Sequence, residues 1–209
     1  MKIKVCGITL PQQFLELERL GADYAGFIFY EKSPRYVLPK MRSRDVTGFP
    51  VKIQKTGVFV NASESTILDQ VALFQLDAVQ LHGNETPMLC ARLRKHIKVI
   101  KAFRINEQNS LIDWLVKPYL DVCDFYLFDH GSGGIYGGTG KKFNWSVLEN
   151  ALVGKEFFLS GGIGPEDAAE LKALKHPFLY AIDINSKFEI SPGIKDMAEI
   201  QEFIQVLKN

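Results

Sequence analysis

The sequence predicts an α/β protein whose eight strands close into a single parallel barrel surrounded by helices. Short apolar runs alternate with amphipathic segments along the whole 209-residue chain. We count eight strand-then-helix units, the number in a (β/α)8 TIM barrel at the short end of its size range. A doubly wound open sheet is the alternative, but it usually has five or six strands. No linker or composition shift divides the chain, so we expect one domain over residues 1–209.

The expected strands are short and apolar, as strands buried on both faces are. They cover residues 3–6, 24–29, 55–60, 78–81, 98–103, 125–128, 156–159 and 179–184. The expected helices cover residues 11–20, 39–46, 63–76, 86–96, 109–116, 145–152, 165–174 and 196–207. Local signals support several helix ends: Thr9 as the N-cap of the first helix, Gly21 after its last turn, Pro87 in a first turn and Pro118 after the fifth helix.

Composition excludes several classes of function. Hydrophobic residues make up 46% of the chain and charged residues 23%, which is ordinary for a globular domain. The net charge of +1 gives no general attraction to nucleic acid or to a membrane surface. No apolar run approaches the ~20 residues that span a bilayer, and the chain enters a strand at once, so we expect no signal peptide. Three cysteines without a CxxC pair favour free thiols and a cytoplasmic protein.

Polar residues stand near the ends of six expected strands. Catalytic groups of this fold lie at the C-terminal ends of the strands, and alternate side chains of a strand share a face. Apolar neighbours take the helix-facing side, which leaves the polar residues for the barrel interior and its rim. The residues that we expect at this rim are Lys4, Cys6, Gln80, His82, Lys101, Asp129, Ser160, Asp183 and Asn185.

Each of these residues also has a structural interpretation. Cys6 alone fits a small buried apolar side chain, and Asp129 alone fits a cap of the following loop. His82 alone fits a hydrogen bond to a loop carbonyl, and Lys4 with Lys101 fits a charge network that fills the barrel. The convergence of all of them at one rim favours a functional site.

Two stretches after the last strands predict a phosphate site. Gly161 and Gly162 follow the seventh strand, and Asn185 and Ser186 follow the eighth. The loops after strands seven and eight form the recurring phosphate site of this fold, where backbone N–H groups contact the anion. The glycine-rich stretch 137–140 lacks the spacing of a nucleotide-binding P-loop, and we interpret it as a mobile loop over the pocket, with a long disordered connection as the alternative.

Charged residues in loops add two further candidates. Pro34 stiffens the loop after the second strand, which either aims Arg35 at the pocket, where a guanidinium suits a carboxylate, or leaves it as an ordinary surface arginine. Lys141 and Lys142 are either solvated or help to hold phosphate. No His or Cys cluster has the spacing of a zinc site, so we expect no metal.

The chain resembles the phosphoribosylanthranilate isomerase family of tryptophan biosynthesis over nearly its whole length. The matching stretches, in order, are Lys4-Val5-Cys6-Gly7-Ile8-Thr9, Gly26-Phe27-Ile28-Phe29, Ser33-Pro34-Arg35-Tyr36, Gly57-Val58-Phe59-Val60-Asn61, Val79-Gln80-Leu81-His82-Gly83, Phe128-Asp129, Gly137-Gly138-Thr139-Gly140-Lys141, Leu159-Ser160-Gly161-Gly162-Ile163 and Pro192-Gly193-Ile194-Lys195-Asp196. The resemblance implies a (β/α)8 barrel that rearranges N-(5'-phosphoribosyl)anthranilate to a 1-deoxyribulose phosphate.

The resemblance also implies roles for residues. Cys6 is expected as general base, Asp129 as general acid and Arg35 as the contact to the anthranilate end. The backbone around Gly161, Gly162, Asn185 and Ser186 is expected to bind phosphate, and we expect Gln80, His82 and Asp183 to line the substrate site. The chain departs from the family pattern at Lys187, where glycine is common, and at Asn144, where aspartate is common.

The chemistry fits these residues. Ring opening requires a protonated acid near pH 7, whereas an ordinary aspartate is ionised there. Removal of the C2' proton requires a thiol whose pKa lies below the usual ~8.5, and Lys4 is a candidate for lowering it. The substrate's imine nitrogen is the electron sink, so we expect no cofactor. The partner is a phosphorylated small molecule, and the protein is a monomer or a homodimer.

Three rival functions remain at this stage. The histidine-pathway isomerase of the same barrel type places an aspartate where Cys6 stands and needs two phosphate sites. A pentose-phosphate epimerase needs a metal-binding set of His and Asp residues that this sequence lacks. A non-catalytic phosphate-binding barrel does not need Cys6 or Asp129.

Overall fold

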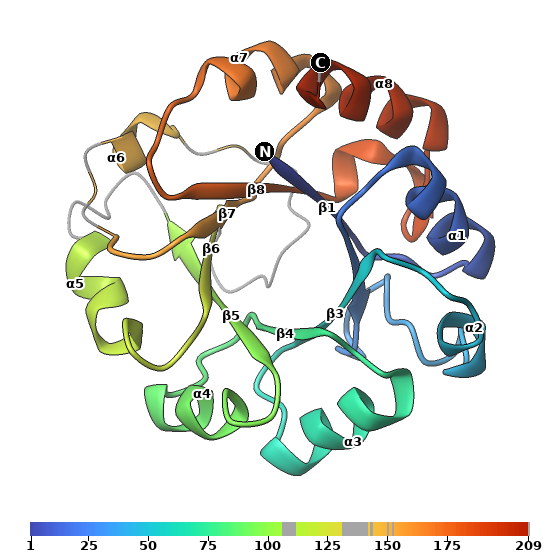
Figure 1. The fold of residues 1–209 in the computed structure, drawn as a ribbon, viewed down its shortest axis with the longest axis horizontal. Helices are drawn as coiled ribbons and strands as arrows, with labels where there is room; N and C mark the ends of the chain where they lie inside the picture. The colour runs from blue at the N-terminus through green and yellow to red at the C-terminus, as the bar shows by residue number, and fades with distance from the viewer. Residues whose placement is uncertain (106–111, 131–141, 143, 150, 152, 209) are drawn as a thin grey trace.

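The computed structural model describes residues 1–105, 112–130, 142, 144–149, 151 and 153–208. Eight parallel strands close into one barrel in sequence order, which confirms the predicted fold class (Figure 1). The strands are Lys2–Cys6 (β1), Tyr24–Ile28 (β2), Gln54–Phe59 (β3), Ala78–Leu81 (β4), Lys98–Ile105 (β5), Phe125–His130 (β6), Phe157–Leu159 (β7) and Leu179–Ile184 (β8).

Helices surround the barrel between successive strands. They are Pro11–Leu20 (α1), Arg44–Thr47 (α2), Glu64–Phe74 (α3), Pro87–Leu93 (α4), Ile112–Val116 (α5), Ser146–Glu149 (α6), Ala168–Ala173 (α7) and Met197–Lys208 (α8). Short 3-10 helices cover Lys117–Tyr119, Pro165–Asp167 and Ser186–Phe188. No helix in these ranges is long and apolar enough to cross a membrane.

The strand alternation sorts side chains into two cores. The outward residues pack against the helices in one large apolar cluster, to which Ile3, Val5 and Phe128 belong. The inward residues near the strand starts form a separate apolar cluster, in which Leu127 packs with residues of five other strands. The barrel interior is therefore apolar at the end where the strands begin. Polar residues occupy it towards the end where the strands finish, among them Lys4, Gln80 and Asp183.

Lys101 breaks the expected pattern. Its neighbours Ile100 and Ala102 belong to the interior cluster, so Lys101 points outward, beside the ring of Phe103. The prediction that Lys101 lies at the inner rim is wrong, because the apolar neighbours on either side of it take the interior positions. Instead, its ammonium donates to the carbonyls of Leu81 and Gly83 and to Glu85 Oε2 at 2.8 to 3.1 Å.

The Lys101–Glu85 pair fixes the loop after β4. Glu85 is 4% exposed and accepts hydrogen bonds from the backbone N–H groups of Gly83 and Asn61. A buried carboxylate with one ammonium and two amide donors is fully paired. This buried pair thus anchors the segment that carries His82.

Several helix ends follow the local signals and others do not. Gly21 ends α1 with φ 79°, and Pro87 lies in the first turn of α4. Thr9 is not an N-cap, because its hydroxyl donates to the carbonyl of Gly193 at 2.6 Å. The helix expected over residues 39–46 is also wrong, since only Arg44–Thr47 is helical. The expected start of the fifth helix, residues 109–111, lies outside the described residues, and so does the glycine-rich stretch 137–140.

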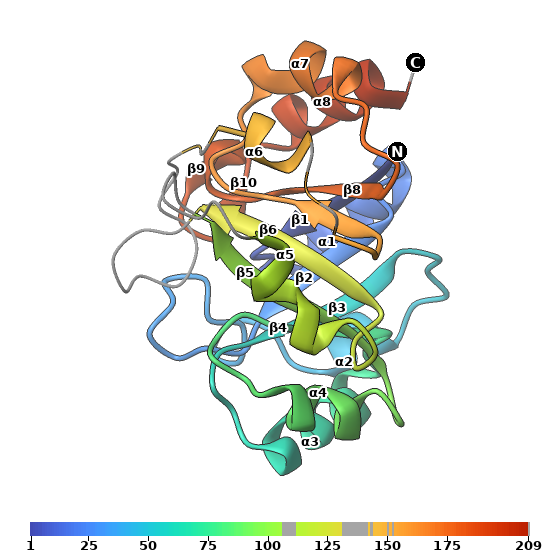
Figure 2. The ribbon, with the colours of Figure 1, turned by 90° about the vertical axis from the view of Figure 1, so that its left-hand side faces the viewer.

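A two-stranded hairpin after β8 is absent from the sequence expectations. It pairs Glu189–Ser191 (β9) with Ile194–Lys195 (β10) in antiparallel fashion. Two- and three-residue strands are too short to give an alternation pattern. Figure 2 shows this hairpin on the side where the barrel strands end.

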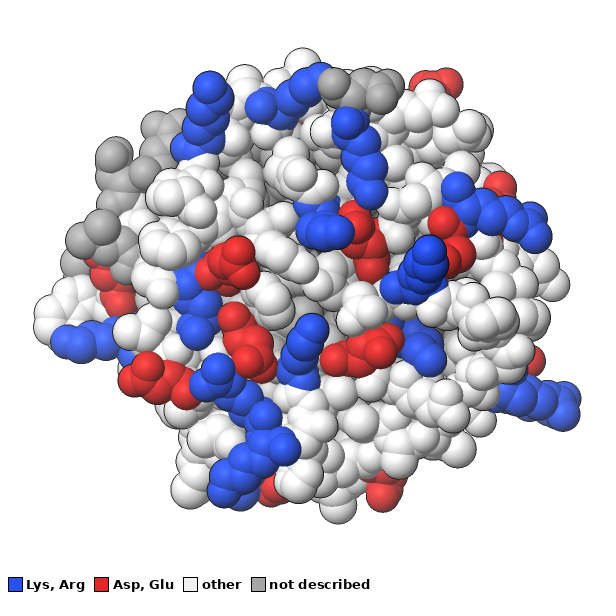
Figure 3. All heavy atoms as spheres, viewed as in Figure 1, with Lys and Arg blue, Asp and Glu red and all other residues white. Residues whose placement is uncertain are grey.

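Three aspartates clip neighbouring strands together at the opposite face. Each stands just before an even-numbered strand and makes two hydrogen bonds to one residue near the start of the preceding strand. The backbone N–H of the aspartate donates to the carbonyl of that residue, and the aspartate carboxylate accepts from its N–H, at 2.7 to 3.0 Å. We call these the aspartate clips; they join Ile3 with Asp23, Lys55 with Asp77, and Val99 with Asp124. Acidic and basic side chains are interspersed on this face (Figure 3), where Asp23 also pairs with Lys2.

We predict that Lys101→Met destabilises the protein by about 3 to 5 kcal/mol, because it leaves the Glu85 charge buried without its cation. Urea unfolding followed by circular dichroism measures this. The exposed Arg92–Glu64 pair is the control, and Arg92→Gln is expected to cost less than about 1 kcal/mol. Equal losses for the two variants would contradict the anchoring role.

Candidate active site

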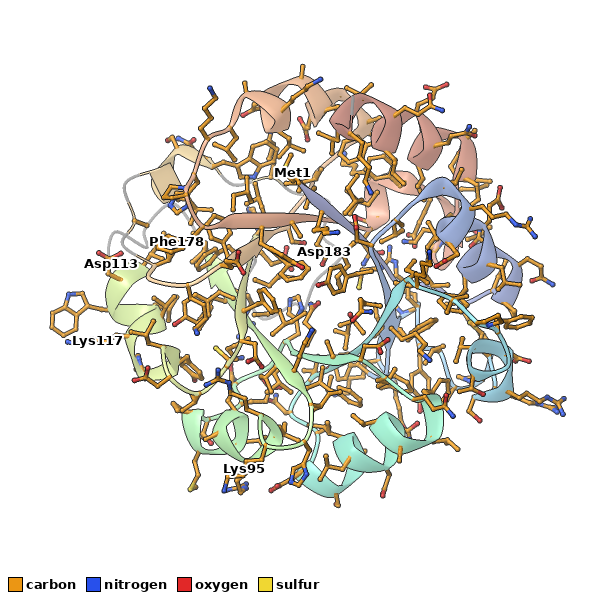
Figure 4. All side chains as sticks on the ribbon, in the orientation of Figure 1. Met1, Lys95, Asp113, Lys117, Phe178 and Asp183 are labelled. Carbon is orange, nitrogen blue, oxygen red and sulfur yellow. The ribbon has the colours of Figure 1, made fainter. Side chains whose placement is uncertain are left out.

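The centre of the site is a buried ion pair inside the barrel. Lys4 Nζ donates to both oxygens of Asp183 at 2.9 Å, and the two side chains are 0% and 4% exposed. The pairing of β1 with β8 sets these two residues opposite each other. Figure 4 shows Asp183 within the ring of strands. The pair closes the barrel directly beneath its reactive end.

Cys6 lies two residues beyond Lys4 on the same inward face and is 4% exposed. A side chain on Gly26 of the adjacent strand would lie 2.7 Å from Sγ, so this glycine makes the space that the thiol occupies. Burial raises the pKa of the Cys6 thiol, and Asp183 adds to this effect. Lys4, the candidate for lowering this pKa, acts in that direction, as does Lys195, but together they do not outweigh burial, and the pKa of the thiol is raised.

Asp129 is the last residue but one of β6, lies on the inward face, as the alternation predicts, and is 7% exposed. Its Oδ1 accepts the N–H of His130 at 2.8 Å, and its Oδ2 lies 3.1 Å from His82 Nε2. Gln80 Nε2 lies 2.8 Å from His82 Nδ1. With Gln80 donating, Nδ1 accepts, so a neutral His82 carries its proton on Nε2 and donates it to Asp129.

Asp183 links the two halves of this interior. Burial raises its pKa, and the nearby charge of Asp129 adds to this effect, whereas Lys4 and His82 oppose it. The pKa of Lys4 is raised, because Asp183 and Cys6 outweigh the opposing effect of burial. The thiol, the lysine and the two carboxyl groups therefore form one electrostatically connected set.

Arg35 lies at the same end of the barrel and is 8% exposed. Its Nε and Nη2 donate to Glu189, with a shortest distance of 2.6 Å. Glu189 Oε1 also accepts Lys195 Nζ at 2.8 Å, and Lys195 donates to Asn185 Oδ1 at 2.7 Å. Sequence reasoning missed Glu189 and Lys195 as parts of the site. The one available signal was the Pro192-Gly193-Ile194-Lys195-Asp196 stretch.

The glycines after β7 have the conformation that close backbone approach requires. Gly161 and Gly162 have φ values of 92° and 70°, and a side chain on Gly161 would lie 2.6 Å from the His130 nitrogen. After β8, Asn185 precedes the short 3-10 helix that Ser186 begins, and Lys187 is exposed. Lys142 Nζ pairs with Asp167 and Glu170 at 2.9 and 2.7 Å, which ties it to the α7 region. Lys141 lies outside the described residues.

These features define a class of protein: a (β/α)8 barrel enzyme whose inward thiol and carboxyl groups at the C-terminal rim are suited to proton transfer. The family of N-(5'phosphoribosyl)anthranilate (PRA) isomerase matches residues 3–206, and the chain belongs to this family. It is an isomerase of tryptophan biosynthesis.

Relatives and solved structures agree with this assignment. The N-(5'-phosphoribosyl)anthranilate isomerase of Parabacteroides distasonis is 41% identical over 98% of this chain and 92% of its own, and that of Phocaeicola vulgatus is 41% identical over 100% and 98%. The phosphoribosyl anthranilate isomerase structure from Thermotoga maritima superimposes with a TM-score of 0.87 at 35% identity, over 100% and 98% of the two chains. These relatives favour the isomerase over its three rivals.

We predict that alkylation of Cys6 in the ligand-free protein accelerates with pH to values above the usual thiol pKa, because burial raises the pKa of this thiol. Iodoacetamide labelling with mass-spectrometric mapping of the Cys6 peptide measures the rate. The peptide of Cys90, which is 0% exposed, is the control for general unfolding. A rate that levels off below pH 8 would show that the lysines outweigh burial.

Proposed function

We propose that Cys6 and Asp129 are the base and the acid of the isomerisation of N-(5'-phosphoribosyl)anthranilate to 1-(2-carboxyphenylamino)-1-deoxyribulose 5-phosphate. The single observation that carries this proposal is their position: both side chains face inward at the same end of one barrel. The connected charges of Lys4 and Asp183 between the two sides support it.

The reaction divides into two proton transfers. In the first, Asp129 acts as the acid and gives a proton to the furanose oxygen, and the C1'–O bond breaks to give a Schiff base between C1' and the anthranilate nitrogen. In the second, the Cys6 thiolate removes the C2' proton, and the electron pair moves to the imine nitrogen. The resulting enolamine then tautomerises to the ketone product. Positioned groups of this kind each accelerate the reaction by a factor of about 10² to 10⁴. The two steps as proposed use no cofactor or metal.

Cys6 must lose its proton when substrate is present. Bound substrate excludes water from the site, and this strengthens the electrostatic interactions inside it. Lys4 and Lys195 are the two cations that lower the pKa of this thiol. We infer that they stabilise the thiolate formed in the second step.

Gln80 and His82 support the acid. The His82 contact to Asp129 Oδ2 and the His130 N–H contact to Oδ1 fix the carboxyl plane. Gln80 in turn holds the imidazole from the other side. We propose that these residues orient Asp129; their direct contact with substrate stays a prediction, as does that of Asp183.

The two anionic ends of the substrate bind at separate places in this proposal. The backbone around Gly161, Gly162, Asn185 and Ser186 takes the phosphate, supported by the positive φ values of both glycines. Arg35 takes the carboxylate of the anthranilate ring, supported by its burial at the same barrel end. A solved phosphoribosyl anthranilate isomerase, 34% identical with a TM-score of 0.84, is in complex with reduced 1-(o-carboxyphenylamino)-1-deoxyribulose 5-phosphate.

The wider setting of the enzyme is also a proposal. Cys6, Cys90 and Cys123 are free thiols, which supports a reducing, cytoplasmic setting. We propose that residues 1–209 act as one catalytic domain, as a monomer or a homodimer, with no nucleic-acid or membrane partner. The Thermotoga maritima relative is described as dimeric.

We predict that anthranilate fluorescence falls when the protein is added to phosphoribosylanthranilate made in situ. Without the enzyme this substrate decays back to fluorescent anthranilate, whereas the enzyme converts it to product first. The fluorescence decay is compared with that of the same mixture without protein. If the fluorescence decays no faster with the protein than without it, the proposed activity is wrong.

We predict that Cys6→Ser and Asp129→Asn each lower kcat by at least about 10², because each removes one proton-transfer group. Steady-state kinetics measure the loss. The matched controls are Cys90→Ser in the helical layer and Asp124→Asn at the opposite face, which should retain turnover. Full activity of Asp129→Asn would move the acid role elsewhere, with Asp183 as the next candidate.

A further inference from the structure

Glu189, on the hairpin after β8, is held between two cations. Its carboxylate accepts Nε and Nη2 of Arg35 on one side and Lys195 Nζ on the other. The backbone N–H of Gly193 donates to Oε1 at 3.0 Å and adds a fourth donor group. The side chain is 4% exposed. Both oxygens are therefore used, and the carboxylate has no room to rotate without losing a partner.

The contact leaves Arg35 with donors to spare. A guanidinium has five N–H groups, and Glu189 engages only Nε and one edge of Nη2. Nη1 has no hydrogen-bond partner among the described residues. The Nη1–Nη2 edge is a second fork with the geometry that binds a carboxylate through two parallel hydrogen bonds.

The position of Arg35 is fixed relative to the reacting groups. A side chain on Gly7, the residue after Cys6, would lie 2.7 Å from Arg35 Cδ and 2.8 Å from Asn185 Oδ1. The guanidinium stem and the phosphate-loop asparagine thus pack against the turn that follows the thiol. A small rotation of Arg35 changes the distance from its free edge to that turn.

We propose that Glu189 is a positioning residue that sets the specificity of this enzyme for a carboxylate on the aryl amine of its substrate, by holding Arg35 with its second fork free. This inference rests on the proposed role of Arg35.

The charges agree with this role. Arg35 and Lys195 both contact the single carboxylate of Glu189, so the cluster has one net positive charge for an anionic substrate when Lys195 is protonated. Burial lowers the pKa of Lys195, and Glu189 opposes this effect. Burial acts to raise the pKa of Glu189, but the bonds from Arg35 and Lys195 outweigh it and leave the pKa lowered. The carboxylate therefore stays ionised at neutral pH. Lys195 also donates to Asn185 Oδ1, and this second hydrogen bond does not involve the Glu189 carboxylate.

The test is Glu189→Gln. Glutamine has one acceptor oxygen where glutamate has two, so its NH2 group faces either Arg35 or Lys195, both of which are donors. Calorimetry measures binding of two probes: reduced 1-(o-carboxyphenylamino)-1-deoxyribulose 5-phosphate, and the same compound without the ring carboxylate. We expect the variant to bind the first probe at least about tenfold more weakly and the second within about twofold of the parent protein.

The matched control is Glu18→Gln. The Glu18 carboxylate also accepts several hydrogen bonds, from the backbone of Lys52 and Ile53, at a distance from this site. It should leave binding of both probes unchanged. If Glu189→Gln does not fold, Glu189→Asp replaces it; it keeps the charge but shortens the reach, and partial loss of discrimination between the probes is expected.

Three results would overturn the inference. Equal weakening of both probes would leave Glu189 a structural role only. If Glu189→Gln or Glu189→Asp discriminates between the two probes as the parent protein does, while Arg35→Lys does not, the proposed role of Glu189 is wrong and that of Arg35 stands. No discrimination between the probes by the parent protein would remove both.

Discussion

The barrel closes where β1 meets β8, and the register of that closure sets Lys4 opposite Asp183. A lysine and an aspartate buried this deeply are tolerated only as a pair, because removing either leaves an uncompensated charge in a medium of low polarity. Cys6 follows Lys4 by two residues, and Asn185 follows Asp183 by two. One register therefore fixes the thiol, the phosphate-loop asparagine and the charges that act on the thiol.

The alternation of strand residues predicted most of the interior. Lys4, Cys6, Gln80, His82, Asp129 and Asp183 all lie where period-two counting and an apolar outer face place them. The prediction succeeds because every strand of a closed parallel barrel is buried on both faces. A polar residue in an apolar strand therefore faces either the helix layer or the barrel interior, and its apolar neighbours take the helix layer. The count of eight strand–helix units gave the barrel for the same reason.

Counting failed where the local pattern was ambiguous. Lys101 lies between two apolar residues that both fit the interior, so nothing in β5 itself reveals that its ammonium bonds the loop after β4. Glu189 and Lys195 lie on strands of two or three residues, where no periodicity exists to read. Their partner Arg35 is 154 residues away from Glu189 in sequence, so their contact depends on the closed barrel.

The aspartate clips have a consequence for how the chain assembles. They join residues separated by 20, 22 and 25 positions, whereas Lys4 and Asp183 are 179 positions apart. Loop-closure entropy rises by about 0.6 kcal/mol for each doubling of length, so closing the ring costs about 2 kcal/mol more than closing a clip. The residue in the corresponding position before β8 is Phe178, which has no carboxylate, so β7 and β8 are not joined by such a clip. Chain entropy thus favours the three clipped strand pairs, which form locally, as the first parts of the barrel to assemble. The contact between the last strands and the first, where the catalytic charges meet, is completed afterwards.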